Sequence, residues 1–151
     1  MSKDMQFDFR WLADPKKVVG DEMFKNVADA GYHLQKQIVN RLKQGGQTGK
    51  TYKVPGTKTN YTASAPGEVP ATVTGWLAQN VVAQPTRENG APVSYVGIRG
   101  GPNGVPYAKR LEYGFVGTDS KGRLYNQAPR PYFRSTYELE KAVIKRKLGG
   151  R

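Results

Sequence analysis

The spacing of apolar residues in the first third of the chain predicts a long amphipathic helix. Apolar or small residues recur at steps of three and four positions, the period of a helix with one buried face: Phe24, Val27, Ala28, Gly31, Leu34, Ile38 and Leu42. Acidic residues precede this stretch and basic residues end it, as the helix dipole favours: Asp21, Glu22, Arg41 and Lys43. We therefore predict a helix of about 24 residues that ends at Gly45 and Gly46.

Alternation of apolar and polar residues predicts a small set of strands. Over 6–11, apolar residues alternate with polar ones, the period of a half-buried strand: Phe7, Phe9 and Trp11. Residues 79–84 and 92–99 are predicted as two further strands, joined through the hairpin-type turn Glu88-Asn89-Gly90. Asp14-Pro15, after the first strand, is an alternative start for the long helix.

The rest of the chain predicts shorter helices and one C-terminal helix. Residues 74–77 suit a single helical turn and 107–113 a short helix. A helix is predicted from about Pro131 to Leu148, with one side formed by Phe133, Tyr137, Glu140, Ile144 and Leu148. The order of elements predicts an α+β fold, in which a small antiparallel sheet packs with a long N-terminal helix and a C-terminal helix.

Two segments without apolar periodicity are predicted to be long loops. Residues 45–73 are rich in glycine, proline and threonine, and 114–128 form a second, glycine-rich stretch. A loop as long as the first is unusual in a compact domain, so it is either functional or ordered by a partner. The chain of 151 residues has the length of one domain, which we assign to 1–151.

Composition narrows the chemistry that the chain can perform. Cysteine is absent from the sequence, which excludes disulfides and thiol nucleophiles. No apolar run reaches the roughly 20 residues of a membrane span, and the N-terminus lacks the apolar core of a signal peptide, so we expect a cytoplasmic location and no membrane partner. The net charge of +12, from 24 basic and 12 acidic residues, favours a nucleic acid or an acidic protein surface as partner.

The stretch QGGQTGKT, residues 44–51, ends like a phosphate-binding P-loop. That motif requires glycine at the position of Gln44. It also requires a strand before it and a helix after it, whereas an amphipathic helix precedes this stretch and Pro55-Gly56 follows it. We therefore predict a helix end followed by a flexible basic loop, without a nucleotide site.

No arrangement of residues predicts catalysis. His33 is the single histidine, so a histidine metal cluster is excluded. The Gly-x-Ser-x-Gly elbow of serine hydrolases is missing, and no pair of carboxylates stands out. We expect His33 to be solvated on a helix face, with Asp29 one turn away as a hydrogen-bond partner. The prediction is a protein that is not an enzyme and has no catalytic residue, metal ligand or cofactor.

The C-terminal segment 130–151 carries seven basic and two acidic residues. Such a helix could follow a phosphate backbone, and the chain would then be a basic nucleic-acid-binding protein. The alternative is a solvated helix end whose basic residues favour its C-terminus.

Four stretches together resemble the neck or tail-completion (head–tail joining) protein family of long-tailed bacteriophages. They are Thr-Gly-Lys-Thr-Tyr at 48–52, SAPGEVPATVTGWL at 64–77, YAKRLEYG at 107–114 and APRPYFR at 128–134. The resemblance covers roughly residues 20–145, with the stretches in the family's order. The sequence departs from the family pattern after Gly114, where the residues before Arg130 indicate a few extra positions in the loop.

The resemblance implies a structural virion protein that forms a homo-oligomeric ring, a hexamer by analogy, at the head–tail junction. Its expected partners are copies of itself, a head-completion or connector protein, and the tail tube or tail terminator protein, with DNA passing through the channel. It would be present in the host cytoplasm during assembly and afterwards in the virion.

The resemblance also implies which residues make contacts. Those expected at subunit or partner interfaces are Ser64, Pro66, Gly67, Glu68, Pro70, Tyr107, Glu112, Arg130, Tyr132 and Arg134. The prolines of 64–70 stiffen that segment, which suits an arm that is ordered before it docks. Basic residues expected to contact DNA or an acidic partner are Lys50, Lys53, Lys58, Lys145, Arg146 and Lys147. Among the aromatic and apolar residues, Phe133 is expected in the core, and Tyr107, Leu111 and Tyr113 are expected to pack on the sheet.

Overall fold

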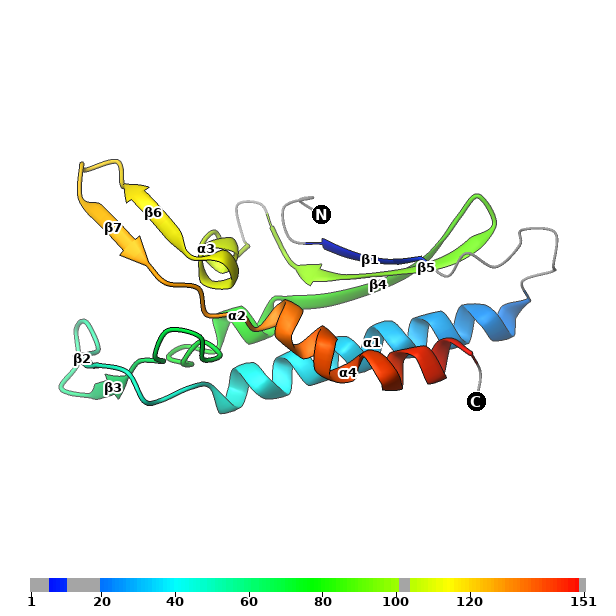
Figure 1. Cartoon of the computed structure of the whole chain (residues 1–151), viewed down its shortest axis with the longest axis horizontal. Helices are drawn as coiled ribbons and strands as arrows, with labels where there is room; N and C mark the ends of the chain where they lie inside the picture. The colour runs from blue at the N-terminus through cyan, green and yellow to red at the C-terminus, as the bar shows by residue number, and fades with distance from the viewer. Residues whose placement is uncertain (1–5, 11–19, 101–103, 150–151) are drawn as a thin grey trace.

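A long helix, a three-stranded sheet and a C-terminal helix form the body of the protein in the computed structural model (Figure 1). The structure describes residues 6–10, 20–100 and 104–149. Its elements are β1 (Gln6–Arg10), α1 (Asp21–Gln44), β2 (Thr51–Lys53), β3 (Asn60–Thr62), α2 (Trp76–Gln79), β4 (Val81–Glu88), β5 (Ala91–Ile98), α3 (Ala108–Tyr113), β6 (Phe115–Thr118), β7 (Leu124–Gln127) and α4 (Phe133–Leu148). The predicted α+β class is confirmed.

Helix α1 is the central element, because it contacts β4, β5 and α4. Its predicted length is confirmed, and the residues that it buries follow the predicted period: Val27, Ala30, Gly31, Leu34, Ile38 and Leu42. The alternative start at Asp14-Pro15 lies outside the described residues. Gly31 faces β5 so closely that an added Cβ would lie 1.9 Å from Oγ of Ser94. This helix therefore packs on the sheet at a distance that only glycine permits.

The main sheet has the order β1-β5-β4 and is antiparallel throughout. The predicted turn is confirmed, since Asn89 and Gly90 both have positive φ, as in the type I′ turns of two-residue hairpins. Strand β4 is longer than predicted and shifted, because Gln79 closes α2 and pairing with β5 continues to Glu88. Pro85 lies within β4, which is an edge strand, where a missing N–H is tolerated.

The core lies between the sheet, α1 and α4. Leu34, Ile38 and Leu42 of α1 meet apolar residues of β5 and the start of α4. Phe133 is fully buried, as predicted, and its ring meets that of Tyr132 edge-on, with 6.3 Å between centroids. Helix α4 runs back along α1 in the opposite direction (Figure 1), and it begins two residues later than Pro131, where we predicted its start.

The two segments predicted as loops, 45–73 and 114–128, each contain a β-hairpin, so the prediction was wrong for these strands, whereas the rest of 45–73 consists of turns and irregular structure. In the first, β2 pairs with β3, and the rings of Tyr52 and Tyr61 lie 5.8 Å apart across the pair. In the second, β6 pairs with β7 around a turn in which the Asp119 carboxylate accepts the backbone N–H of Lys121 and of Arg123. These strands are short and mostly exposed, so they show no apolar period.

Candidate functional site

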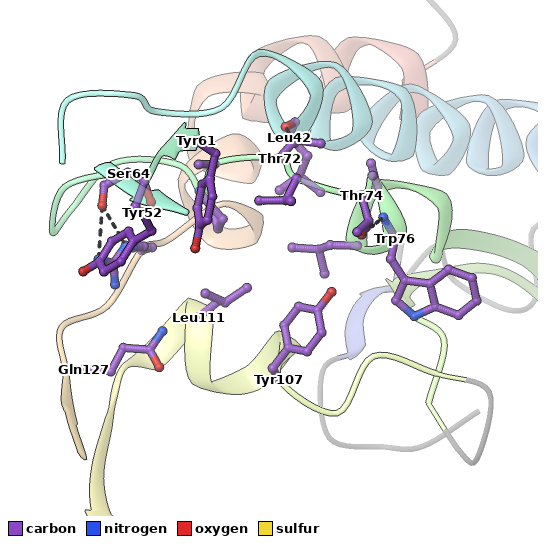
Figure 2. A pocket seen from close by; sticks show the side chains of 18 of the residues that line it. Leu42, Tyr52, Tyr61, Ser64, Thr72, Thr74, Trp76, Tyr107, Leu111 and Gln127 are labelled. Atoms are coloured by element: carbon purple, nitrogen blue, oxygen red, sulfur yellow. Dashed lines mark hydrogen bonds between the residues drawn. The ribbon is translucent and has the colours of Figure 1, made fainter. Parts of the chain in front are cut away.

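The two small hairpins project beyond the main sheet at the end of the molecule where α1 ends (Figure 1). Between them, the segment 63–76 and α3 complete the walls of a groove of about 770 Å³. Figure 2 shows side chains from these separate elements facing one common space. Its lining includes five aromatic residues: Tyr52, Tyr61, Trp76, Tyr107 and Tyr125. No lining residue is acidic, and Arg130 is the one lining residue with a positive charge.

One wall of the groove is built on a tight turn at Ala65–Glu68. Pro66 occupies the second position and Gly67 the third, with a φ of 84°, and the Glu68 N–H donates to the Ala65 carbonyl at 3.1 Å. Proline followed by a residue with positive φ is the signature of a type II turn. The sequence Ala-Pro-Gly-Glu therefore determines this turn locally. The segment is thus an ordered turn within the chain, and its role as an arm that docks on a neighbour stays a prediction.

The side chain of Glu68 ties this turn to the stretch that resembled a P-loop. Its carboxylate accepts the Thr48 hydroxyl at 2.6 Å and the Ala65 N–H at 2.8 Å. The hydrogen bond from Thr48 is the main reason that the pKa of Glu68 lies below its usual range. The carboxylate of Glu68, a predicted interface residue, is thus hydrogen-bonded to residues of its own chain.

Gly49 brings the two segments into direct backbone contact. Its N–H donates to the Ala63 carbonyl at 2.8 Å. An added Cβ at Gly49 would lie 2.7 Å from the carbonyl oxygens of Ala63 and Ser64, so a side chain cannot fit there. The helix end that we predicted for QGGQTGKT is confirmed, since α1 ends at Gln44 and a strand begins at Thr51. Gly49, the third glycine of this stretch, allows the backbone to pack closely against residues 63–64.

Arg130 joins the turn segment to the residues that precede α4. Its guanidinium donates to the Ser64 carbonyl at 3.1 and 3.2 Å and to the Ala128 carbonyl at 3.3 Å. The Gly67 N–H donates to the Pro129 carbonyl at 3.0 Å. These bonds connect one wall of the groove to the other. The guanidinium of Arg130 is thus hydrogen-bonded to backbone carbonyls within the chain.

Glu112 caps the N-terminus of α4. Its carboxylate is buried and accepts the N–H groups of Tyr132, Phe133 and Arg134, each at 2.9 Å. A carboxylate at this end of a helix satisfies orphan donors and interacts favourably with the helix dipole. The bond from Arg130 N–H to the Leu111 carbonyl adds to this junction between α3 and α4.

Two predicted interface residues are therefore corrected to internal positions. Glu112 is 4% exposed and Tyr132 is fully buried, with its hydroxyl directed at the Ala108 carbonyl at 3.4 Å. Burial, together with the charge of Glu112, raises the pKa of Tyr132. Both side chains hold the chain together at the α3–α4 junction, so neither presents a surface to a neighbour.

The other predicted interface residues differ in exposure. Pro66, Gly67, Tyr107 and Arg134 are exposed, whereas Ser64 and Pro70 are buried in the wall of the groove. Burial also raises the pKa of Tyr107, although its side chain remains accessible from the groove. Leu111 packs against the core as predicted. Tyr107 and Tyr113 are exposed and do not pack on the sheet, so this prediction was wrong.

The predicted basic contact residues fall on two separate surfaces. Lys50, Lys53 and Lys58 are exposed on the β2–β3 hairpin. Lys145 and Arg146 are exposed near the end of α4, at the other end of the molecule (Figure 1). The third residue of that set, Lys147, pairs with Asp29 at 2.6 Å. No single basic face contains both groups.

His33 binds Glu140 rather than Asp29, so our expectation for the histidine was wrong. Its Nε2 lies 2.7 Å from the Glu140 carboxylate, and both side chains are largely buried between α1 and α4. A signal for this pair was present in the sequence. Glu140 falls on the apolar side of the predicted C-terminal helix, where an acidic residue needs a partner from the packed element.

Within the described ranges, no group of three or more histidine, cysteine or acidic residues is placed to hold a metal ion. None of the described helices is long and apolar enough to span a membrane. Comparison of the chain with family models, with curated proteins and with solved structures found no match. The candidate site is thus defined by its own geometry, a groove with aromatic residues in its walls, which the bonds of Arg130 and Gly67 connect.

Proposed function

We propose that this protein is a structural component of a tailed-phage virion that forms a homo-oligomeric ring at the head–tail junction. One observation carries the proposal. The four stretches that resemble the neck family lie far apart in the sequence, yet they meet at one end of the fold. Glu68 links the first to the second, Arg130 links the second to the fourth, and Glu112 links the third to the fourth.

The chemistry of this end of the molecule supports binding to other proteins. Its surface exposes tyrosine and tryptophan rings, which are enriched at the centres of protein interfaces. The two hairpins are isolated two-stranded sheets, which have marginal stability alone and gain from packing against a neighbour. In a homo-oligomeric ring, the neighbours on both sides are further copies of the chain.

The partners in this proposal are those of a junction ring. Copies of the chain would surround a channel, as a hexamer by analogy with the family, between the head-completion or connector protein and the tail tube or terminator protein. The excess positive charge would face the DNA in the channel or acidic surfaces of neighbouring rings. The alternative is nucleic-acid binding through α4, where Lys145 and Arg146 are exposed and Lys147 pairs with Asp29.

The test is a conditional null allele in the phage that carries the gene. Infection without the protein should yield DNA-filled heads and separate, complete tails, and expression in trans should restore joined particles. Cryo-electron microscopy of intact virions should then place a ring of this fold at the neck. Normal virions from the null phage, or purified virions that lack the protein, would refute the proposal.

A further inference from the structure

The groove lies in a region where positive charge is not balanced. Between Asp29 and Glu68 the sequence contains no acidic residue and six basic ones: Lys36, Arg41, Lys43, Lys50, Lys53 and Lys58. The three on the β2–β3 hairpin are exposed, and none of the ion pairs between described residues involves them. These lysines do not line the groove themselves, but they belong to the hairpin whose Tyr52 and Tyr61 do, and we call them its rim. A ligand that approaches along this hairpin therefore meets several free ammonium groups.

The acidic residues around the groove are already occupied. Glu68 accepts bonds from Thr48 and Ala65, and buried Glu112 caps α4. Asp119 accepts the Arg123 backbone N–H at 2.9 Å, the Arg123 side chain at 2.7 Å and the Lys121 backbone N–H at 2.9 Å, and these bonds hold its pKa below the usual range. None of the three lines the groove, so an acidic segment that enters it meets no carboxylate among the lining residues.

Aromatic surface is exposed inside this positive rim. Trp76 is 44% exposed and Tyr107 is 42% exposed, and both line the groove together with Tyr52 and Tyr61. In Figure 2, Tyr107 just before α3, Leu111 within α3 and Tyr61 from β3 face the same space. Large rings left accessible in a concave surface mark a place where an apolar part of a partner is buried.

We propose that the groove binds an extended, acidic, proline-containing segment of a neighbouring protein. The inference rests on the proposed function in one respect, because the neighbour would be another protein of the junction. Grooves lined by tyrosine, tryptophan and proline suit extended segments, whose prolines and apolar side chains pack on the rings. Acidic residues of the segment would pair with Lys50, Lys53 and Lys58 on the rim and steer its approach.

The position of the charges favours a polypeptide over a nucleic acid. Single-stranded nucleic acid carries a phosphate at every nucleotide and needs cations along its whole path. Arg130, the cation that lines the groove, already donates to carbonyls of Ser64 and Ala128. The free cations lie on the rim, which fits a segment whose acidic residues flank an apolar centre.

The probe is a library of random 12-residue peptides displayed on a carrier, selected against the full-length protein. Selected peptides should share acidic residues interspersed with proline and aromatic or aliphatic residues. Synthetic copies should shift the NMR signal of the Trp76 indole N–H. The double variant Trp76→Ala/Tyr107→Ala should weaken peptide binding about tenfold or more. The matched control Tyr32→Ala removes a ring that is also half exposed, on α1 away from the groove, and should leave binding unchanged.

Charge reversal tests the rim separately. The triple variant Lys50→Glu/Lys53→Glu/Lys58→Glu should weaken binding of the acidic peptides about tenfold or more, while Lys145→Glu/Arg146→Glu should not. Selected peptides without acidic residues, or binding that the groove variant does not change, would overturn the proposal. A twelve-residue thymidine oligonucleotide that displaces the peptides at lower concentration would assign the groove to nucleic acid instead.

The outcome can be separated from that of the proposed function. A ring seen at the neck without peptide binding would overturn only the groove assignment. Peptide binding by a protein that is missing from virions would overturn only the ring.

Discussion

Removal of the Glu112 carboxylate should weaken the whole fold, because this group caps α4 from a buried position. Glu112→Ala would leave three backbone N–H groups without an acceptor, and two of them belong to the fully buried Tyr132 and Phe133. Loss of a helix N-cap costs about 0.5–2 kcal/mol, and each buried donor without a partner costs about 1–3 kcal/mol. Since water can reach the exposed Arg134, we expect a loss of about 2–4 kcal/mol in the free energy of unfolding.

The conservative variant Glu112→Gln tests the capping interaction alone, because glutamine fills nearly the same space as glutamate. In the wild type, one carboxylate oxygen accepts the N–H groups of Tyr132 and Phe133, and the other accepts that of Arg134. Glutamine keeps one acceptor but places an NH₂ group against a backbone donor and loses the charge at the helix dipole. We expect a loss of about 1–2 kcal/mol.

Urea unfolding followed by circular dichroism measures both variants, and Glu138→Ala serves as the control. Glu138 is an exposed acidic residue of the same helix, whose contact with Lys141 is a surface pair worth about 0–0.5 kcal/mol. If Glu112→Ala unfolds within about 0.5 kcal/mol of the wild type, the reasoning that assigns Glu112 to the cap is wrong.

Three further predictions test other contacts. Gly31→Ala should cost about 1–3 kcal/mol through overpacking against β5, and an unchanged melting temperature would contradict this. A double-mutant cycle of His33→Ala and Glu140→Ala should give a coupling energy of about 1 kcal/mol, and additive losses would show no direct interaction. Thr48→Val should raise the pKa of Glu68, measured by ¹³C NMR titration of the carboxyl carbon. Because the folded pKa of Glu68 is lowered from 4.5, its contribution to stability is present above that pH and is lost as the pH falls through the folded value, and this acid dependence should shrink in Thr48→Val.

Several features of this protein follow from the sequence alone, because their causes are local. Helix α1 was predictable over its full described length, since its buried residues repeat with the helical period. The turn at Asn89-Gly90 and the turn at Pro66-Gly67 were predictable for a similar reason, because few residues adopt the backbone angles that these turns need. In each case, neighbours within a few positions determine the conformation.

Other features were decided only when distant segments packed together. Nothing near Glu112 in the sequence shows that its carboxylate accepts hydrogen bonds from the N–H groups of residues 132–134. We expected this residue at a subunit contact. The β6–β7 hairpin lacks an apolar period, so its residues resembled a loop.

The groove itself belongs to this second group. Its walls come from β2–β3, the segment 63–76, α3 and β6–β7, which have no common pattern in the sequence. The helices, the tight turns and the excess of positive charge can be predicted from the sequence, since each depends on residue type and short spacing. Which polar groups are satisfied inside the chain and which aromatic rings remain exposed depends on the packing of the fold, because both follow from contacts between residues far apart in the sequence.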